Sequence, residues 1–259
     1  MKVVVLVSGG ADSTILAAHT KKHHPNDEIV LIHYDYGHPF EYKERQSLPE
    51  GTIIRRFDWL NPNEEYPIPE SDPNHLPGRD FAMITQAMIQ ENPDRIYLGL
   101  LHGEMNSYLD QSYEFYYRLN HLLRIVSPTG KRVEVEAPLE ARGFDKKAAF
   151  EWALQNGFTA ESLSLTSSCM HHEHQKCGVC PVCVRRWGIF VELGLLQYEG
   201  DTVFANKHTA LQAYCSFLQD EAINPDDSDF LKALMIYFKT QDVTELDGLI
   251  QNKIEEVPS

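Results

Sequence analysis

The sequence predicts an α/β fold in which helices cover an open parallel sheet. Short apolar runs rich in valine and isoleucine alternate along the chain with longer segments of helical periodicity, as in strands joined by crossover helices. The chain has 259 residues, 42% of them hydrophobic, which is enough for one substantial core. We therefore expect one main domain over residues 1–193 and a helical extension over residues 194–259.

The elements of this fold can be placed in order. Residues 2–7 form a continuous apolar run, typical of a strand buried on both faces, and residues 13–24 have the pattern of its crossover helix. Residues 61–77 are rich in proline and carry little periodicity, so we expect a loop there, either covering a site or a plain surface excursion. The further strands are expected at residues 29–34, 52–57, 95–100 and 132–137, and the further helices at residues 81–90, 113–125, 146–155 and 230–238.

Charge and hydropathy exclude some classes of protein. The formal net charge of −15 would repel polyanions over most of the surface, so a groove that follows a nucleic-acid backbone is not expected. No apolar run approaches the roughly 18 residues that span a bilayer, and the N-terminus lacks the features of a secretory signal. We expect a cytoplasmic protein without a membrane segment, and a homo-oligomer remains open.

The first predicted strand is followed by the string Ser-Gly-Gly-Ala-Asp-Ser. Gly9 and Gly10 would let the backbone turn tightly against a phosphate, because glycine tolerates positive φ and has no side chain. The next amides would point at the ligand from a helix N-terminus, whose dipole attracts anions. Ser8 and Ser13 can donate hydroxyl hydrogen bonds, and Asp12 could orient Mg²⁺ or the nucleotide. An ordinary tight turn is the alternative.

This string differs from the Gly-x-x-x-x-Gly-Lys-Ser/Thr loop that serves γ-phosphate transfer. It resembles the loop of the PP-loop ATP pyrophosphatases, which cleave ATP to AMP and pyrophosphate while they activate a carboxylate or carbonyl. The resemblance implies that the chain is an ATP-consuming enzyme.

Four of the five cysteines crowd into residues 169–183, with intervals of seven, two and two residues. Two Cys-x-x-Cys steps that share one cysteine predict a structural Zn²⁺ site, and four sulfur ligands would leave no open position for catalysis. Buried thiols are the alternative, and a histidine at residues 171–174 could replace one ligand. The predicted ligands are Cys169, Cys177, Cys180 and Cys183.

Together these features resemble QueC, the 7-cyano-7-deazaguanine synthase family, over roughly residues 1–190. The family's motifs appear as Asp35-Tyr36-Gly37-His38, Pro77-Gly78-Arg79-Asp80, Pro138-Leu139 with a later Lys146, and Cys183-Val184-Arg185-Arg186. The resemblance implies a Rossmann-like parallel sheet of the PP-loop (adenine nucleotide alpha hydrolase-like) type with a zinc-binding segment. It also implies ATP, Mg²⁺ and Zn²⁺ as cofactors and 7-carboxy-7-deazaguanine as substrate. Family members form an amide with ammonia and then use a second ATP to dehydrate it to a nitrile.

The same resemblance suggests roles for individual residues. Lys146 and Arg79 are candidates to neutralise phosphate charge, and Asp80 and His38 to hold the base or position an attacking amine. The segment of Tyr36, Gly37 and His38 would border the nucleotide. Solvated surface positions, a helix cap or a loop are the ordinary alternatives for these residues.

The chain departs from the family at two places. Where the family carries Asp-Cys-Arg-x-x-Phe, this chain has Gln111 and Ser112 in place of the cysteine and arginine, and His102 stands where an acid is expected, with Glu104 close by. Losing a guanidinium from a carboxylate or phosphate site removes a bidentate partner. The roughly 70 residues beyond the cysteines exceed the usual family length, and serve either as a stabilising cap or as a surface for a protein.

Three functions follow from these observations. The first is a ligase that transfers the activated deazaguanine acyl group to a protein amine, as QueC-like paralogues of type IV CBASS antiviral systems do. The second is a 7-cyano-7-deazaguanine synthase that uses ammonia. The third is an inactive zinc-containing binding module, against which the intact string at residues 8–13 and the acidic charge argue.

Overall fold

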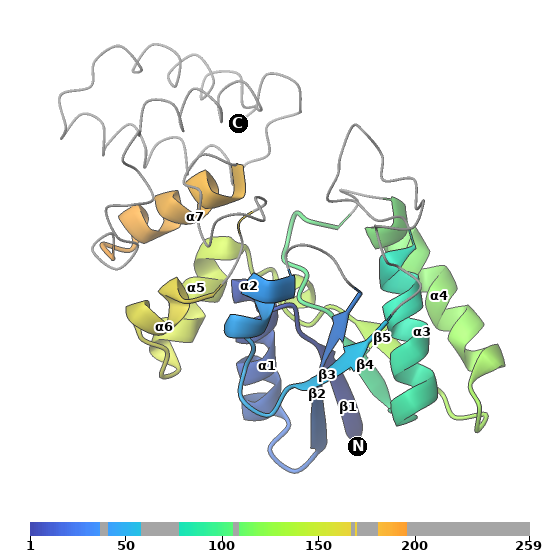
Figure 1. Cartoon of the computed structure of the whole chain (residues 1–259). Coiled ribbons are helices and arrows are strands. Elements are labelled where there is room, and N and C mark those ends of the chain that lie inside the picture. The colour runs from blue at the N-terminus through green and yellow to red at the C-terminus, as the bar shows by residue number, and fades with distance from the viewer. Residues whose placement is uncertain (37–40, 58–77, 106–108, 167–168, 170–180, 196–259) are drawn as a thin grey trace. The chain divides into compact units, whose positions relative to one another are not determined.

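The structure, a computed structural model, describes residues 1–36, 41–57, 78–105, 109–166, 169 and 181–195 (Figure 1). The chain divides into two compact units, Met1–Ala153 and Leu154–Ser259. The predicted division after residue 193 stays a prediction. The expected loop at residues 61–77 and the expected helix at residues 230–238 lie outside the described residues.

In the described part of the first unit, five parallel strands form one sheet in the order β3-β2-β1-β4-β5. The central strand β1 is buried on both faces, and Val3, Val4 and Val5 are fully buried. The predicted α/β fold with a parallel sheet is therefore confirmed. The strands are β1 (Lys2–Leu6), β2 (Glu28–Asp35), β3 (Ile53–Arg56), β4 (Arg95–Tyr97) and β5 (Glu134–Glu136).

Helices connect these strands as expected, and each of the four predicted helices of this unit is present with ends shifted by at most two residues. The helix α2 was not predicted, because six residues are too few to display an amphipathic period. The strands β4 and β5 are shorter than expected, since the chain leaves the sheet soon after Tyr97 and Glu136. The helices are α1 (Ala11–His23), α2 (Glu41–Gln46), α3 (Arg79–Glu91), α4 (Tyr113–Val126) and α5 (Lys146–Gln155), with short 3₁₀ turns η2 (Leu109–Gln111) and η3 (Glu140–Arg142).

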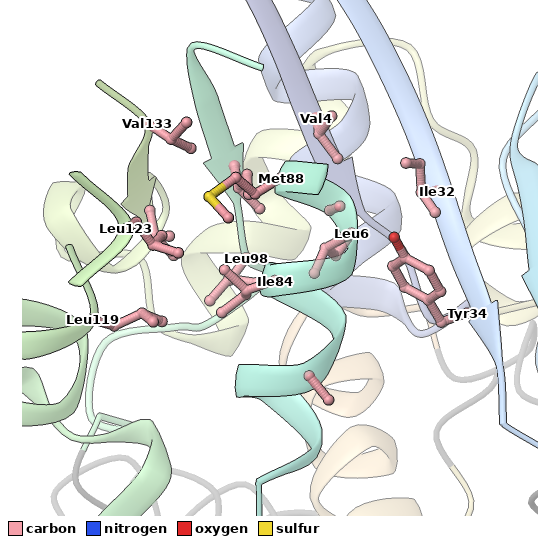
Figure 2. Close-up of a cluster of buried hydrophobic side chains, with 14 of the residues drawn as sticks. Val4, Leu6, Ile32, Tyr34, Ile84, Met88, Leu98, Leu119, Leu123 and Val133 are labelled. Atoms are coloured by element: carbon pink, nitrogen blue, oxygen red, sulfur yellow. The ribbon is translucent and has the colours of Figure 1, made fainter. Parts of the chain in front are cut away.

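The main hydrophobic core lies between the sheet and the helices α3 and α4, which cover one of its faces (Figure 1). Strand residues two apart and helix residues four apart point into the same space, as the two periodicities require. Each fully buried aliphatic side chain contributes roughly 1.5–3 kcal/mol relative to exposure. Figure 2 shows this cluster, which includes Val4, Leu6, Ile32, Tyr34, Ile84, Met88, Leu98, Leu119, Leu123 and Val133.

The helix α4 also completes the hydrogen bonding of the edge strand β5. Glu134 N and Glu136 O bond to residues on the β4 side, so the peptide groups of Val135 face away from β4. The side chain of Asn120 meets both of them: its Nδ2 donates to Val135 O at 3.0 Å, and its Oδ1 accepts from Val135 N at 2.7 Å. Asn120 thus anchors β5 to α4.

A buried histidine lies on the inner side of α1. His19 is 3% exposed and stacks on His23 with ring centroids 4.0 Å apart, while the rings of Trp152 and Phe144 lie at 5.1 and 6.1 Å. Its Nε2 has no hydrogen-bond partner among the described residues. Burial, and secondarily the charges of His23 and Arg142, lower the pKa of His19 to about 4.

This histidine makes the free energy of unfolding depend on pH. The unfolded chain binds a proton at His19 near pH 6.5 and the folded chain only near pH 4, so the contribution is complete above about pH 6.5 and is lost as the pH falls toward 4. When the pH is lowered from 7 to 4.5, the unfolding free energy should fall less in His19→Phe than in the wild type. We expect the two falls, measured by urea denaturation, to differ by about 2–3 kcal/mol. Equal losses in the two proteins would contradict this account.

In the described part of the second unit, α6 (Ala160–Ser164) and α7 (Pro181–Glu192) are joined by a buried arginine. The guanidinium of Arg186 donates to Thr166 O at 3.1 Å, to Thr166 Oγ1 at 2.7 Å and to Leu163 O at 2.5 Å. These carbonyls lie at the C-terminal end of α6, where the helix dipole favours a cation. The last arginine of the Cys183-Val184-Arg185-Arg186 motif therefore has a structural role. None of the helices in the described ranges is long and apolar enough to cross a bilayer.

Candidate nucleotide site

The candidate site lies at the carboxyl edge of the sheet, where β1 has β2 on one side and β4 on the other. The connections from β1 and β4 leave in opposite directions at such a position and open a crevice, the usual place for a ligand in this architecture. The predicted phosphate loop, residues 8–13, follows β1 here, and Tyr36 follows β2.

The loop has the conformation that a phosphate cradle needs. Gly9 has a φ of 78°, in the region that favours glycine, and Gly10 is the extended N-cap residue of α1. Ser13 Oγ accepts from Ser8 N at 3.1 Å and donates to Gly10 O at 3.2 Å, so its hydroxyl closes the turn from inside. Ser13 is buried whereas Ser8 is exposed, so of the two predicted hydroxyl donors Ser8 is the one at the surface.

A second glycine borders the loop and was not singled out in the sequence. Gly99 follows β4, and a Cβ built there would lie 2.9 Å from both the N and the Cα of Ser13. Only glycine lets the two backbones approach this closely. In the sequence Gly99 lies inside the strand expected at residues 95–100, where a glycine is a signal of close backbone approach, but its contact with α1 was not visible there.

Asp12 and Lys146, both predicted as catalytic, lie together. Lys146 is the first residue of α5 and its Nζ forms an ion pair with Asp12 Oδ2 in the first turn of α1. Asp145 Oδ1 accepts from Ala148 N at 2.6 Å and so caps α5, which fixes where Lys146 begins the helix. Asp12 Oδ1 is buried and has no hydrogen-bond partner among the described residues. A carboxylate oxygen left in this state is a suitable ligand for Mg²⁺.

Arg79 and Asp80 lie at the start of α3 and belong to a polar cluster with Tyr36. Asp80 Oδ1 accepts from Arg79 Nε at 3.4 Å, and its Oδ2 accepts from Tyr116 OH at 3.4 Å. Desolvation opposes the charge of Arg79, but the interactions with Tyr36 and Asp80 outweigh it and raise its pKa. Burial and then the charge of Asp80 raise the pKa of Tyr116, so this phenol remains a hydrogen-bond donor at neutral pH.

Of the two residues at which the sequence departs from the family pattern, Gln111 contacts this cluster and Ser112 caps a helix. Gln111 Nε2 donates to Asp80 Oδ2 at 3.2 Å, and the preceding Asp110 accepts from Gly78 N at 2.9 Å. Ser112 is the N-cap of α4, and its Oγ accepts from Phe115 N at 3.1 Å. Sequence reasoning identified the departure but missed that Gln111 contacts Asp80, because the two residues are 31 positions apart.

A third cluster of polar side chains comes from the segments that follow β4 and β5. His102 Nδ1 lies 3.9 Å from Glu140 Oε1, the same oxygen that accepts a hydrogen bond from Tyr113 OH. Glu104 Oε2 accepts from Leu101 N at 2.9 Å and thereby closes the turn after β4. Glu140 and Tyr113 were not predicted, since neither belongs to a motif.

Some predicted site residues cannot be placed. Gly37 and His38 lie outside the described residues, as do Cys177 and Cys180. Cys169 and Cys183 are buried and belong to one small cluster with Val182, so the two ends of the cysteine segment meet. Among the residues that the structure describes, no group of three His, Cys, Asp or Glu side chains could hold a metal ion. The Zn²⁺ site stays a prediction.

Comparisons with known proteins agree on one family. The family model described as queuosine biosynthesis protein QueC matches residues 2–56 and 61–194. A 7-cyano-7-deazaguanine synthase from Campylobacter jejuni is 26% identical over 219 residues, which cover 74% of this chain and 95% of that protein. Proteins of the same name from Nitratiruptor sp. and Chlorobaculum tepidum are each 26% identical, over 217 and 235 residues, and are covered to 96% and 97%.

Proposed function

We propose, because this chain belongs to the QueC family, that it binds ATP at residues 8–13 and adenylates the carboxylate of 7-carboxy-7-deazaguanine. The acyl group then passes to an amine. The observation that carries this proposal is the loop itself, in which two glycines join β1 to α1 at the edge of the sheet, beside the Asp12–Lys146 ion pair. The names of the relatives support a 7-deazaguanine substrate.

The chemistry proceeds in two balanced steps. A carboxylate accepts amines poorly, because its oxygen is a bad leaving group. A substrate carboxylate oxygen therefore attacks the α-phosphorus of ATP. The bond from this phosphorus to the oxygen that bridges the α- and β-phosphates breaks, and pyrophosphate leaves with that oxygen. The amine nitrogen then attacks the acyl carbon, the acyl–phosphate bond breaks, AMP leaves and the amine loses a proton.

The described residues can serve these steps by electrostatics and positioning. Backbone amides at the start of α1 face the phosphates with the positive end of the helix dipole, and the Lys146 ammonium adds a full charge. Asp12 would hold Mg²⁺ through its unpartnered oxygen, and the ion would supply charge neutralisation for the phosphates. Arg79 remains a cation at all relevant pH values, and its proposed role is to hold an anionic group.

The identity of the amine is the finer part of the proposal. We assign a partner-protein amine, such as an N-terminus, because Gln111 and Ser112 stand where the family pattern has a cysteine and an arginine, and Gln111 contacts Asp80. This assignment would make the chain part of an antiviral system of the type IV CBASS kind. The second candidate uses ammonia and produces 7-cyano-7-deazaguanine, the activity after which the relatives are named.

One experiment tests the reaction and its acceptor. The purified protein is supplied with ATP, Mg²⁺ and 7-carboxy-7-deazaguanine, with ammonium or with proteins encoded beside it, and the products are followed by mass spectrometry. AMP formation with a mass increase on a protein and no nitrile supports the first candidate. A nitrile as the main product supports the second, and no AMP with any acceptor sinks the enzymatic proposal.

The close approach of Gly99 gives a direct test of the loop. Gly99→Ala would force the backbone at Ser13 to move, so we expect ATP affinity to fall at least about tenfold and unfolding free energy to fall by about 1–3 kcal/mol. Calorimetric titration with ATP and urea denaturation measure the two effects. Gly130→Ala is the control: a Cβ there meets nothing within 4 Å, although its φ of 70° disfavours alanine. Normal ATP binding by Gly99→Ala would contradict the assignment.

A further inference from the structure

The loop is held from outside by a residue that no motif includes. Ser47 follows α2, and its Oγ donates to Gly9 O at 2.9 Å. The same hydroxyl lies 3.2 Å from Glu44 O and 3.5 Å from Lys43 O, but it has one hydrogen to donate and Gly9 O is the nearest acceptor.

The position of this contact determines the direction of an amide. In a planar trans peptide the C=O and N–H bonds point in opposite directions. With Gly9 O turned toward Ser47, the Gly10 N–H points to the other side of the loop, where it donates to Ser8 Oγ at 3.4 Å. That side is where the exposed hydroxyl of Ser8 and the first turn of α1 would meet a phosphate.

A glycine pair makes such an anchor necessary. Rotation of the peptide plane between residues 9 and 10 changes ψ of one glycine and φ of the next, and both tolerate the rotation because neither has a Cβ. A rotated plane would present a carbonyl oxygen to the phosphates in place of an N–H donor. The helix α2 can approach closely enough to prevent this because Gly9 has no Cβ. A Cβ at this position would clash with Glu44 O and lie 2.9 Å from Ser47 Oγ.

We propose that Ser47 is a positioning residue for nucleotide binding, which fixes the Gly9–Gly10 peptide plane so that its N–H faces the phosphates of ATP. This inference rests on the proposed function, since it assumes that the loop binds a nucleotide. Ser47 acts through the backbone and does not itself touch the ligand.

The test compares a triphosphate with a nucleoside. Binding of α,β-methylene-ATP, which resists cleavage at the reacting bond, and of adenosine is measured by calorimetry for the wild type, Ser47→Ala and Ser47→Thr. We expect Ser47→Ala to bind the triphosphate analogue about tenfold more weakly with unchanged adenosine affinity, and Ser47→Thr, which keeps the hydroxyl, to recover most of the loss. Thr52→Val is the matched control, because Thr52 Oγ1 donates to Pro49 O at 2.6 Å and its hydroxyl bonds within the same connection.

Each outcome decides between the two proposals. Equal triphosphate affinity in the wild type and Ser47→Ala overturns the role of Ser47 and leaves the proposed function standing. A parallel loss for adenosine and the triphosphate, or an equal loss in Thr52→Val, shows a general structural effect and also overturns it. A wild type that binds no triphosphate overturns the proposed function together with this inference.

Discussion

Lys146→Ala is expected to lower the rate of AMP formation by about 10²–10³-fold, because the substitution removes a full positive charge from the phosphate end of the site. The loss should appear in kcat, since the ammonium would stabilise charge that develops on the departing pyrophosphate. Release of pyrophosphate and AMP, followed in a coupled assay, measures it. Lys147→Ala is the matched control, because the neighbouring Lys147 is exposed and should leave the rate within about twofold.

A stability measurement separates this catalytic role from a structural one. In Lys146→Ala the half-buried carboxylate of Asp12 loses its cationic partner, so the unfolding free energy should fall by about 1–2 kcal/mol. The double variant Asp12→Asn with Lys146→Ala removes the unpaired charge and should recover stability, but it also removes the proposed Mg²⁺ ligand, so only its stability is compared. AMP formation by Lys146→Ala is measured under conditions in which urea denaturation shows it fully folded, and a normal rate there would show that the lysine only supports the fold.

Removal of the predicted Zn²⁺ is expected to have the largest effect on stability. Cys169 and Cys183 are already buried together, so Cys183→Ser should abolish binding of one Zn²⁺ and lower the unfolding free energy by on the order of 5 kcal/mol. This is less than the total of about 10–16 kcal/mol seen for zinc-finger peptides, since buried Trp187 and Phe190 still contribute a core. Metal content by mass spectrometry and thermal unfolding with and without a chelator measure both effects.

The fifth cysteine supplies the control for this prediction. Cys215→Ser changes a thiol outside the cysteine cluster and should retain one Zn²⁺ per chain and most of the stability. A Cys183→Ser protein with full zinc content, or a wild type that is purified without zinc and is equally stable, would contradict a four-thiolate site.

The predictable part of the fold rests on strong local signals. The strand β1 and the second half of β2 are buried and therefore rich in apolar residues. The helices α3 and α4 bury residues four positions apart, so their period is visible in the sequence. The helix α2 has neither signal, because it is short and its Tyr42 is exposed. Its place against the loop at residues 8–13 depends on a contact between two residues that are 38 positions apart in the chain, which no local pattern encodes.

The candidate site was predictable to a similar extent. The two glycines in the string at residues 8–13 predict its tight turn. The resemblance to a family identified Lys146, Arg79 and Asp80 as candidate site residues. The partners that orient these residues were missed: Gln111 and Tyr116 on Asp80, and Gly99 against α1. Their residue types are common, and only the packing of separate elements brings them to the site.

The amide of Asn120 has a consequence for association with other chains. An edge strand with unpaired peptide groups is a template for strand addition and aggregation. At β5 a side-chain carboxamide occupies the outward N–H and C=O of Val135 in the way a neighbouring strand would. An incoming strand would have to displace Asn120 from both bonds before it could extend the sheet at this edge, so α4 guards the protein against sheet-to-sheet polymerisation there.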